Sequence, residues 1–122
     1  MEGRKKVLIV DDDPEVVKVM GMMLNLRGFD VVEALCGMKG CLLARRERPD
    51  IILLDIMMPD IDGFEVCRRL RLDSDTHDIP VIFVSAKTGQ DHIDRGLSLG
   101  AQGYIKKPFE LNDLLREINK LV

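Results

Sequence analysis

Near the middle of the chain stands the sequence Ile51-Ile52-Leu53-Leu54-Asp55, in which four consecutive branched apolar residues end in an acid. A short apolar run of this kind is typical of a β-strand buried on both faces, as in a parallel sheet covered by helices. Similar runs occur at Val7–Val10 and Val81–Val84. These three runs predict the central strands of a parallel sheet.

Amphipathic segments separate the apolar runs, and their ends carry helix signals. Asp13-Pro14-Glu15 opens the first helix, because aspartate caps, proline suits the first turn and glutamate complements the helix dipole. Gly28 ends this helix. In a second helix, Gly37–Glu47, we expect the inner side to consist of Leu42, Leu43 and Ala44. The remaining expected elements are the strands Phe29–Ala34 and Gly103–Lys106 and the helices Phe64–Leu72, Gln90–Leu99 and Leu111–Val122.

Alternation of strands and helices without a linker or low-complexity segment predicts an α/β fold with helices on both faces of a parallel sheet. Right-handed crossovers leave few topologies, of which a doubly wound, five-stranded, flavodoxin-like sheet of order 2-1-3-4-5 is the natural candidate. We expect one domain over residues 1–122, since this length is usual for a single domain. Its ligand crevice would lie at the carboxyl ends of strands 1 and 3, where the winding reverses.

Composition excludes several classes of protein. A hydrophobic share of 46% and a charged share of 32% are typical of a globular chain. A net charge of −3 and an aromatic share of 4% give neither a basic surface nor stacking platforms for nucleic acid. The run Val7–Val10 is too short for a secretory signal, and no run approaches membrane-spanning length. We therefore expect a cytoplasmic protein that binds neither membrane nor nucleic acid directly.

The three cysteines, Cys36, Cys41 and Cys67, are odd in number and show no CxxC spacing. This pattern argues against a disulfide framework and against a thiolate metal site, so we expect buried structural thiols. The two histidines, His77 and His92, stand isolated in polar surroundings and are expected at the surface.

Acidic residues follow the first and third predicted strands. Asp11 and Asp12 come directly after the first strand, and Asp55 ends the third, so the topology brings all three to the crevice. Clustered carboxylates repel one another, and a hard divalent cation relieves that repulsion. Oxygen ligands without histidine or cysteine favour Mg²⁺. Asp13, by contrast, is expected to be only a helix cap.

Two further strand ends lie at the same rim of the predicted sheet. Ser85 follows the fourth strand and Lys107 the fifth. A hydroxyl and an ammonium beside a carboxylate and a cation form a phosphoryl-binding constellation. Lys106 and Lys107 should point to opposite faces, and Pro108 restricts Lys107 to an extended backbone, which favours Lys107 as the inward-pointing ammonium. Tyr104 should face away from the site, toward the helix Gln90–Leu99.

Together these motifs resemble the receiver domains of bacterial two-component response regulators, over nearly the whole chain. The matching segments are Val10-Asp11-Asp12, Leu54-Asp55-Ile56-Met57-Met58-Pro59 followed by Gly63, Val84-Ser85-Ala86, and Lys107-Pro108-Phe109.

The resemblance implies a role for each site residue. Asp55 would be the nucleophile that takes a phosphoryl group from a sensor histidine kinase. Ser85 and Lys107 would each bind a phosphoryl oxygen. The chain would be a regulatory domain that catalyses only its own phosphorylation and dephosphorylation. Mg²⁺ would be held by Asp12, Asp55, the main-chain carbonyl of Met57 and, directly or through water, Asp11.

The resemblance also implies a switch. Tyr104 matches an aromatic residue that swings inward when the hydroxyl residue, here Ser85, moves toward the phosphate. The face formed by the fourth helix, fifth strand and fifth helix would then control an output domain or a downstream protein. Receiver domains often have a cis peptide at the position of Lys107-Pro108. The resemblance leaves open the cognate kinase, homodimerisation and the lifetime of the phosphate. Met57 and Lys87 fall at positions that vary in the family, so they do not define that lifetime.

Two other interpretations compete with a receiver. A phosphatase of the haloacid-dehalogenase kind would also place acids after the first strand, and Asp11-x-Asp13 fits its motif loosely. However, Glu15 stands where that motif has threonine or valine, no acidic pair follows a later strand, and the chain has no room for a cap domain. The other alternative is a receiver-like binding module that is never phosphorylated, against which the intact Asp55 and Lys107 argue.

Overall fold

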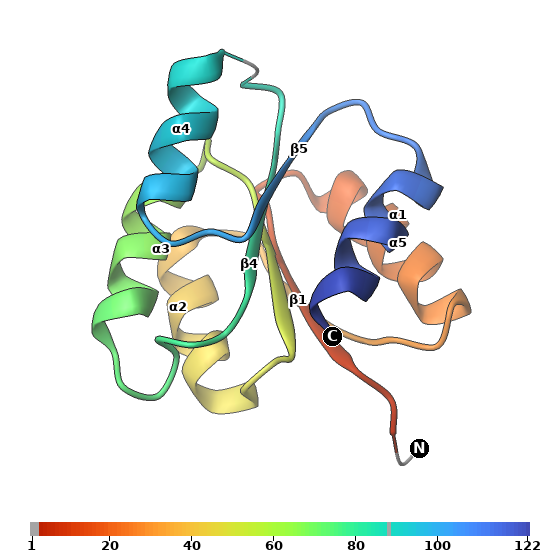
Figure 1. Cartoon of the computed structure of the whole chain (residues 1–122). Coiled ribbons are helices and arrows are strands. Elements are labelled where there is room, and N and C mark those ends of the chain that lie inside the picture. Colours follow the sequence, from red (N-terminus) through yellow and green to blue (C-terminus); the bar gives the residue numbers. More distant parts are fainter. Residues whose placement is uncertain (1–2, 88) are drawn as a thin grey trace.

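Five parallel strands form one sheet in the order β2-β1-β3-β4-β5 in the computed structural model, which describes residues 3–87 and 89–122 (Figure 1). The predicted fold class and strand order are confirmed. Observed and expected element bounds differ by no more than one residue. The elements are β1 Lys6–Val10, α1 Pro14–Leu26, β2 Asp30–Ala34, α2 Gly37–Glu47, β3 Ile51–Leu54, α3 Gly63–Leu72, β4 Val81–Ser85, α4 Gln90–Ser98, β5 Gly103–Lys106 and α5 Leu111–Leu121.

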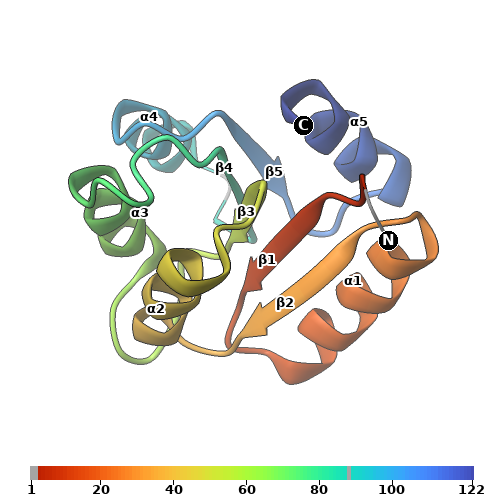
Figure 2. The ribbon, with the colours of Figure 1, turned by 90° about the horizontal axis from the view of Figure 1, so that it is seen from below.

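Helices cover the sheet on both faces. The helices α1 and α5 lie on one face and α2, α3 and α4 on the other, as seen along the sheet in Figure 2. Successive residues of β3 enter opposite layers: Ile51 and Leu53 pack under α1 and α5, whereas Ile52 and Leu54 pack under the other three helices. This double burial explains why the central strands are continuous apolar runs. Within the described ranges, no helix combines the length and the apolar character needed to cross a bilayer.

The start and end of α1 follow the sequence signals. The Asp13 carboxylate accepts hydrogen bonds from the main-chain nitrogens of Glu15 at 3.0 Å and Val16 at 3.4 Å, which confirms it as the cap. Gly28, after the last turn, has a φ of 93°, a left-handed conformation that favours glycine.

The expected inner side of α2 was wrong in part. Leu42 is 50% exposed and Leu43 half-buried, and the inner side consists of Gly37, Gly40 and Ala44. The reason is the short distance between α2 and the sheet, since a Cβ on Gly40 would lie only 2.8 Å from Cγ1 of Val10. Small residues therefore face the strand, Leu43 packs at the edge of the core, and Met38 and Leu42 turn outward.

The cysteines and histidines also depart in part from expectation. Cys67 is buried, but Cys36 and Cys41 are only half-buried, and all three thiols are free. Burial raises the pKa of the Cys41 and Cys67 thiols, which is typical of unreactive thiols. His77 is exposed as predicted, whereas His92 is half-buried because α4 turns its ring toward an aromatic residue of α3.

Gly63, the first residue of α3, packs directly on the backbone after β3. A Cβ on Gly63 would lie 2.1 Å from the main-chain oxygen of Asp55 and 2.9 Å from Cα of Ile56. The main-chain nitrogen of Gly63 also donates a hydrogen bond of 2.7 Å to the Ile56 carbonyl. Because backbone rather than a flexible side chain occupies the space, the position of Asp55 depends on a glycine here.

We expect Gly63→Ala to lower the free energy of unfolding by about 1–3 kcal/mol, the usual cost of overpacking. Gly103→Ala is a matched control, because a Cβ at Gly103 would meet its nearest neighbour at an ordinary 3.6 Å. Urea unfolding measures both changes. Equal losses in the two variants would contradict the importance of the close approach at Gly63.

Candidate functional site

Three carboxylates meet at the carboxyl end of the sheet, between β1 and β3. Val10 pairs with Leu54, so Asp11 and Asp55 leave their strands at the same level. One carboxylate oxygen from each of Asp11, Asp12 and Asp55 lies within 4.8 Å of the others. Asp11 and Asp55 are only 4% and 9% exposed, whereas Asp12 is exposed. The clustering predicted from the topology is confirmed.

The sheet fixes the two buried acids through their main chains. The nitrogen of Asp55 donates to the carbonyl of Val10 at 2.9 Å, and the nitrogen of Asp11 donates to the carbonyl of Ala34 at 3.1 Å. Each carboxylate also accepts a main-chain hydrogen bond through Oδ1: Asp11 from Asp13 at 3.0 Å and Asp55 from Ile56 at 2.7 Å. The second oxygen of each acid is thus left for another partner.

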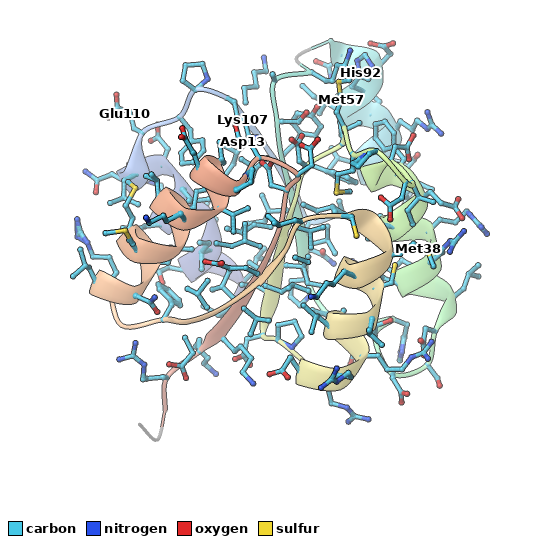
Figure 3. All side chains as sticks on the ribbon, turned by 180° about the vertical axis from the view of Figure 1, so that it is seen from behind. Asp13, Met38, Met57, His92, Lys107 and Glu110 are labelled. Atoms are coloured by element: carbon cyan, nitrogen blue, oxygen red, sulfur yellow. The ribbon has the colours of Figure 1, made fainter. Side chains whose placement is uncertain are left out.

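That partner is the ammonium of Lys107. Its Nζ donates to Oδ2 of Asp11 at 2.6 Å and to Oδ2 of Asp55 at 3.2 Å. Lys106 is exposed, so the two lysines point to opposite sides as predicted. Figure 3 shows Lys107 and Asp13 at the same end of the molecule. The peptide Lys107-Pro108 is cis, as the resemblance implied.

Burial and mutual contact shape the charges of this cluster. Burial raises the pKa of Asp11, although its hydrogen bonds from Lys107 and from the Asp13 main chain oppose the rise. For Lys107, burial would lower the pKa, but the hydrogen bond and charge of Asp11 and the charge of Asp55 outweigh it, so the pKa is raised and the ammonium stays charged.

Three carboxylates against one ammonium leave an excess of negative charge in a half-enclosed space. The donors are all oxygens, without histidine or cysteine, and this set suits a hard divalent cation. The cluster could therefore hold a metal ion. Met57 follows Asp55 by two residues, and its side chain is exposed at the same end of the molecule as Lys107 (Figure 3).

Ser85 lies beside the acids at the end of β4. It is the last residue of the strand, whereas the sequence predicted that it follows the strand. The residue is buried, and its Oγ accepts a hydrogen bond of 3.2 Å from the main-chain nitrogen of Lys87. The Ser85 carbonyl accepts a bond of 2.9 Å from the main-chain nitrogen of Lys107. The ends of β4 and β5 are therefore joined beside the acids.

Tyr104 connects the rim of the site with the α4 side of the sheet. Its ring packs against Phe83 with centroids 6.0 Å apart, on the α4 side as expected. Its hydroxyl, however, returns to the rim and donates to the main-chain carbonyl of Lys87. Burial raises the pKa of Tyr104; a hydrogen bond with Ser85 opposes this effect and the charge of Asp55 adds to it. Tyr104 and Ser85 are thus linked through the main chain of Lys87, whose carbonyl accepts from Tyr104 and whose nitrogen donates to Ser85.

Asp60 is a positioning residue that the sequence analysis missed. Its carboxylate accepts hydrogen bonds from the main-chain nitrogens of Gly37 at 2.9 Å and Met38 at 2.7 Å, at the start of α2. These bonds, chiefly that from Met38, hold the pKa of Asp60 well below its usual range. The sequence signal is Cys36, which makes no side-chain cap, so α2 needs a partner from elsewhere. Asp60 thereby ties the loop after Asp55 to α2.

A groove of about 660 Å³ lies beside Lys107, between α1 and the loop after β5. Its apolar lining includes Val16, Val19 and Met23 of α1 together with Pro108 and Phe109. An apolar groove next to a polar cluster can bind a partner close to the acidic residues.

Comparison with known proteins adds to this geometry. The family model described as the response regulator receiver domain matches residues 7–119 of the chain. The chain is 42% identical over 118 residues to the DNA-binding dual master transcriptional regulator RpaA of Synechocystis, covering 96% of this chain and 48% of RpaA. It is 39% identical over 117 residues to Protein PilH of Pseudomonas aeruginosa, covering 96% of this chain and 97% of PilH.

Another relative is the DNA-binding response regulator MtrA of Mycolicibacterium smegmatis, 36% identical over 115 residues, with 94% of this chain and 49% of MtrA covered. The chain thus spans about half the length of RpaA and MtrA and nearly all of PilH.

Solved structures are similar in fold. The chemotaxis protein CheY4 of Vibrio cholerae matches with a TM-score of 0.92 and 28% identity, over 98% of this chain and 100% of that one. The BeF3-activated N-terminal receiver domain of Klebsiella pneumoniae RstA matches with a TM-score of 0.89 and 32% identity, over 95% of this chain and 97% of that one.

The bond between Asp60 and α2 predicts a pH dependence. A carboxyl whose folded-state pKa is depressed contributes stability above its ordinary pKa, and this contribution is lost as the pH falls. We expect Asp60→Asn to lower the melting temperature at pH 7 and to change it less at a pH near 3. Melting followed by circular dichroism checks this, with Asp113→Asn at an exposed position of α5 as the control. A loss in Asp60→Asn that is independent of pH would contradict the role of the charge.

Proposed function

The chain belongs to the family of response regulator receiver domains, and on that premise we propose that Asp55 accepts a phosphoryl group from the phosphohistidine of a sensor histidine kinase. The observation that carries the proposal is a buried carboxylate pair, Asp11 and Asp55, joined by the ammonium of Lys107 at the strand ends. The reaction would depend on Mg²⁺.

The chemistry follows from the arrangement of Asp55. Its Oδ1 accepts a hydrogen bond from the Ile56 main chain, which orients the carboxylate, while Oδ2 accepts one from the Lys107 ammonium. In the proposed reaction a carboxylate oxygen attacks the phosphorus in line, the phosphorus–nitrogen bond breaks, and the imidazole leaves with the donor. An acyl phosphate forms on Asp55. Lys107 then pairs with one phosphoryl oxygen, and the Ser85 hydroxyl donates to another.

The proposed Mg²⁺ ligands are Asp11, Asp12, Asp55 and the main-chain carbonyl of Met57. The bound ion would neutralise charge on the phosphoryl oxygens. Exposed Asp12 leaves the cluster open on the side from which a donor would approach. The groove between α1 and the loop after β5 is the surface on which we place the kinase, because it is apolar and borders Lys107. Val19 of this lining is 54% exposed, so an apolar side chain on the groove is open to a partner.

We assign the output to the face formed by α4, β5 and α5. In the proposed switch, Ser85 moves toward the phosphate and Tyr104 occupies the space beside it, which biases α4 between two positions. RpaA and MtrA are about twice as long as this chain, which leaves room in them for an output domain. In the proposal, such a domain or a separate protein would bind the face formed by α4, β5 and α5. The proposal takes residues 1–122 as one receiver domain that acts in the cytoplasm.

Metal binding is tested by thermal melting with Mg²⁺. We expect Mg²⁺ to raise the melting temperature of the wild type by mass action. Asp12→Asn should require on the order of tenfold more Mg²⁺ for the same effect, because it removes one charged ligand. Asp13→Asn is the matched control, since Asp13 caps α1 and asparagine caps equally well. Identical Mg²⁺ dependence in wild type and Asp12→Asn would show that the metal site is wrongly assigned.

Phosphorylation is tested with acetyl phosphate and Mg²⁺, followed by intact-protein mass spectrometry. The wild type should gain one phosphoryl group that is labile in acid and base, and Asp55→Asn should gain none while melting normally. Peptide mapping should place the group on Asp55. Mapping to Asp11 or Asp13, or steady release of phosphate without an adduct, would favour the hydrolase; no reaction at all would favour a binding module.

A further inference from the structure

The helix α4 makes few apolar contacts with the rest of the described chain. Gly96 is the one buried residue of α4 among the residues that the structure describes, and Leu97 is 45% exposed. Gly96 lies so close to the Phe83 ring that a Cβ there would be 2.8 Å from Cδ2. Because helices in proteins are stabilised mainly by packing of an apolar face, the few side chains that contact α4 largely fix its position.

Phe64, a buried residue of α3, contacts two side chains of α4. The guanidinium carbon of Arg95 lies 4.3 Å from the centroid of the Phe64 ring, within the range of a cation–π interaction. The ring of His92 stacks on Phe64 with centroids 6.4 Å apart and planes 12° apart. His92 and Arg95 are three residues apart and therefore share one face of α4. We call Phe64, His92 and Arg95 the α4 clamp.

Phe64 is the partner to which Arg95 is directed. Among the described residues, no carboxylate oxygen lies within 4.0 Å of the Arg95 guanidinium, and the nearby Glu65 pairs instead with Arg68 and Arg69. A hollow of about 270 Å³ between α3 and α4 lies beside the clamp. The two helices are thus joined at the Phe64 ring, with space next to it into which α4 can shift.

The clamp is continuous with the rim of the candidate site. The Phe64 ring contacts Phe83 at a centroid distance of 5.5 Å, and Phe83 contacts Tyr104 at 6.0 Å. The Tyr104 hydroxyl donates to the Lys87 carbonyl next to Ser85. A row of aromatic rings therefore leads from α4 to the residues that we expect to respond to the phosphate. In this structure the clamped α4 and the inward Tyr104 hydroxyl occur together.

We propose that the α4 clamp is a regulatory device: Phe64, His92 and Arg95 hold α4 in the position that accompanies the inward Tyr104, and thereby favour phosphorylation of Asp55. The inference rests on the proposed function. Its physical basis is linkage, because contacts made only in one conformation raise the affinity of any ligand that prefers that conformation. Loosening the clamp should weaken the binding of a phosphoryl group at Asp55, although none of the three clamp residues belongs to the acidic cluster.

The experiment combines beryllofluoride binding in the presence of Mg²⁺ with amide hydrogen exchange across residues 90–98. In Arg95→Ala we expect α4 to exchange faster and the half-saturating beryllofluoride concentration to rise about two- to fivefold, the range of a partly exposed cation–π contact. Arg95→Lys keeps the cation and should restore most of both values. Phe64→Leu should have a larger effect. Phe29→Leu, the same change in a residue buried under α1, should leave both values as in the wild type.

The two proposals fail in different ways. If α4 exchanges faster in Arg95→Ala and Phe64→Leu but the beryllofluoride affinity stays within twofold of the wild type, the clamp is only structural and the inference is overturned. Tighter binding in the variants overturns it as well. Failure of the wild type itself to bind beryllofluoride overturns the proposed function, and the inference with it.

Discussion

One ammonium holds the candidate site together, because Lys107 lies between the buried carboxylates of Asp11 and Asp55. Two buried acids this close would repel each other strongly without a cation. The ammonium relieves that repulsion with hydrogen bonds to both acids, and it comes from the strand at one edge of the sheet. The end of β5 is thereby tied to the ends of β1 and β3. A cation or a phosphoryl group that enters the site must change these same bonds.

The surrounding fold keeps the acids at fixed positions. The register of β1 and β3 brings Asp11 and Asp55 side by side at the strand ends. Gly63 has no side chain, so the start of α3 can pack against the Asp55 main chain. Asp60 joins the intervening loop to α2. Each of these constraints acts on the main chain, so the backbone sets the position of the Asp55 carboxylate and the Lys107 ammonium binds its second oxygen. Such preorganisation is what electrostatic stabilisation of a charged transition state requires.

Much of this arrangement could be predicted from the sequence. Apolar runs of strand length marked the parallel sheet, and acids directly after two of the runs marked its switch point. Pro108 and strand alternation distinguished Lys107 from Lys106. These features are local, because each depends on the spacing of residues within one strand or on the end of that strand.

The features that sequence reasoning missed depend on contacts between elements. Leu42 turns outward because α2 approaches Val10 too closely for a large side chain. Asp60 caps a helix more than twenty positions earlier in the chain. His92 stands among polar residues in the sequence but faces Phe64 in the fold. Contacts between different elements decide all three, and the residue pattern within a single helix does not contain those contacts.

The two faces of the sheet suggest a division of roles within the proposed mechanism. On the side of α1 and α5, large apolar side chains such as Leu24, Leu114 and Ile118 are fully buried, and the groove beside Lys107 lies between the firmly packed α1 and the loop after β5. On the other side, α4 packs through Gly96 on the ring of Phe83 and through Arg95 on the ring of Phe64. A donor needs a rigid surface to place its phosphoryl group within reach of Asp55, whereas a signal needs an element that moves at little cost. Within the proposed mechanism, the weak attachment of α4 would let this helix respond to one added phosphate, as a helix packed as firmly as α1 would not.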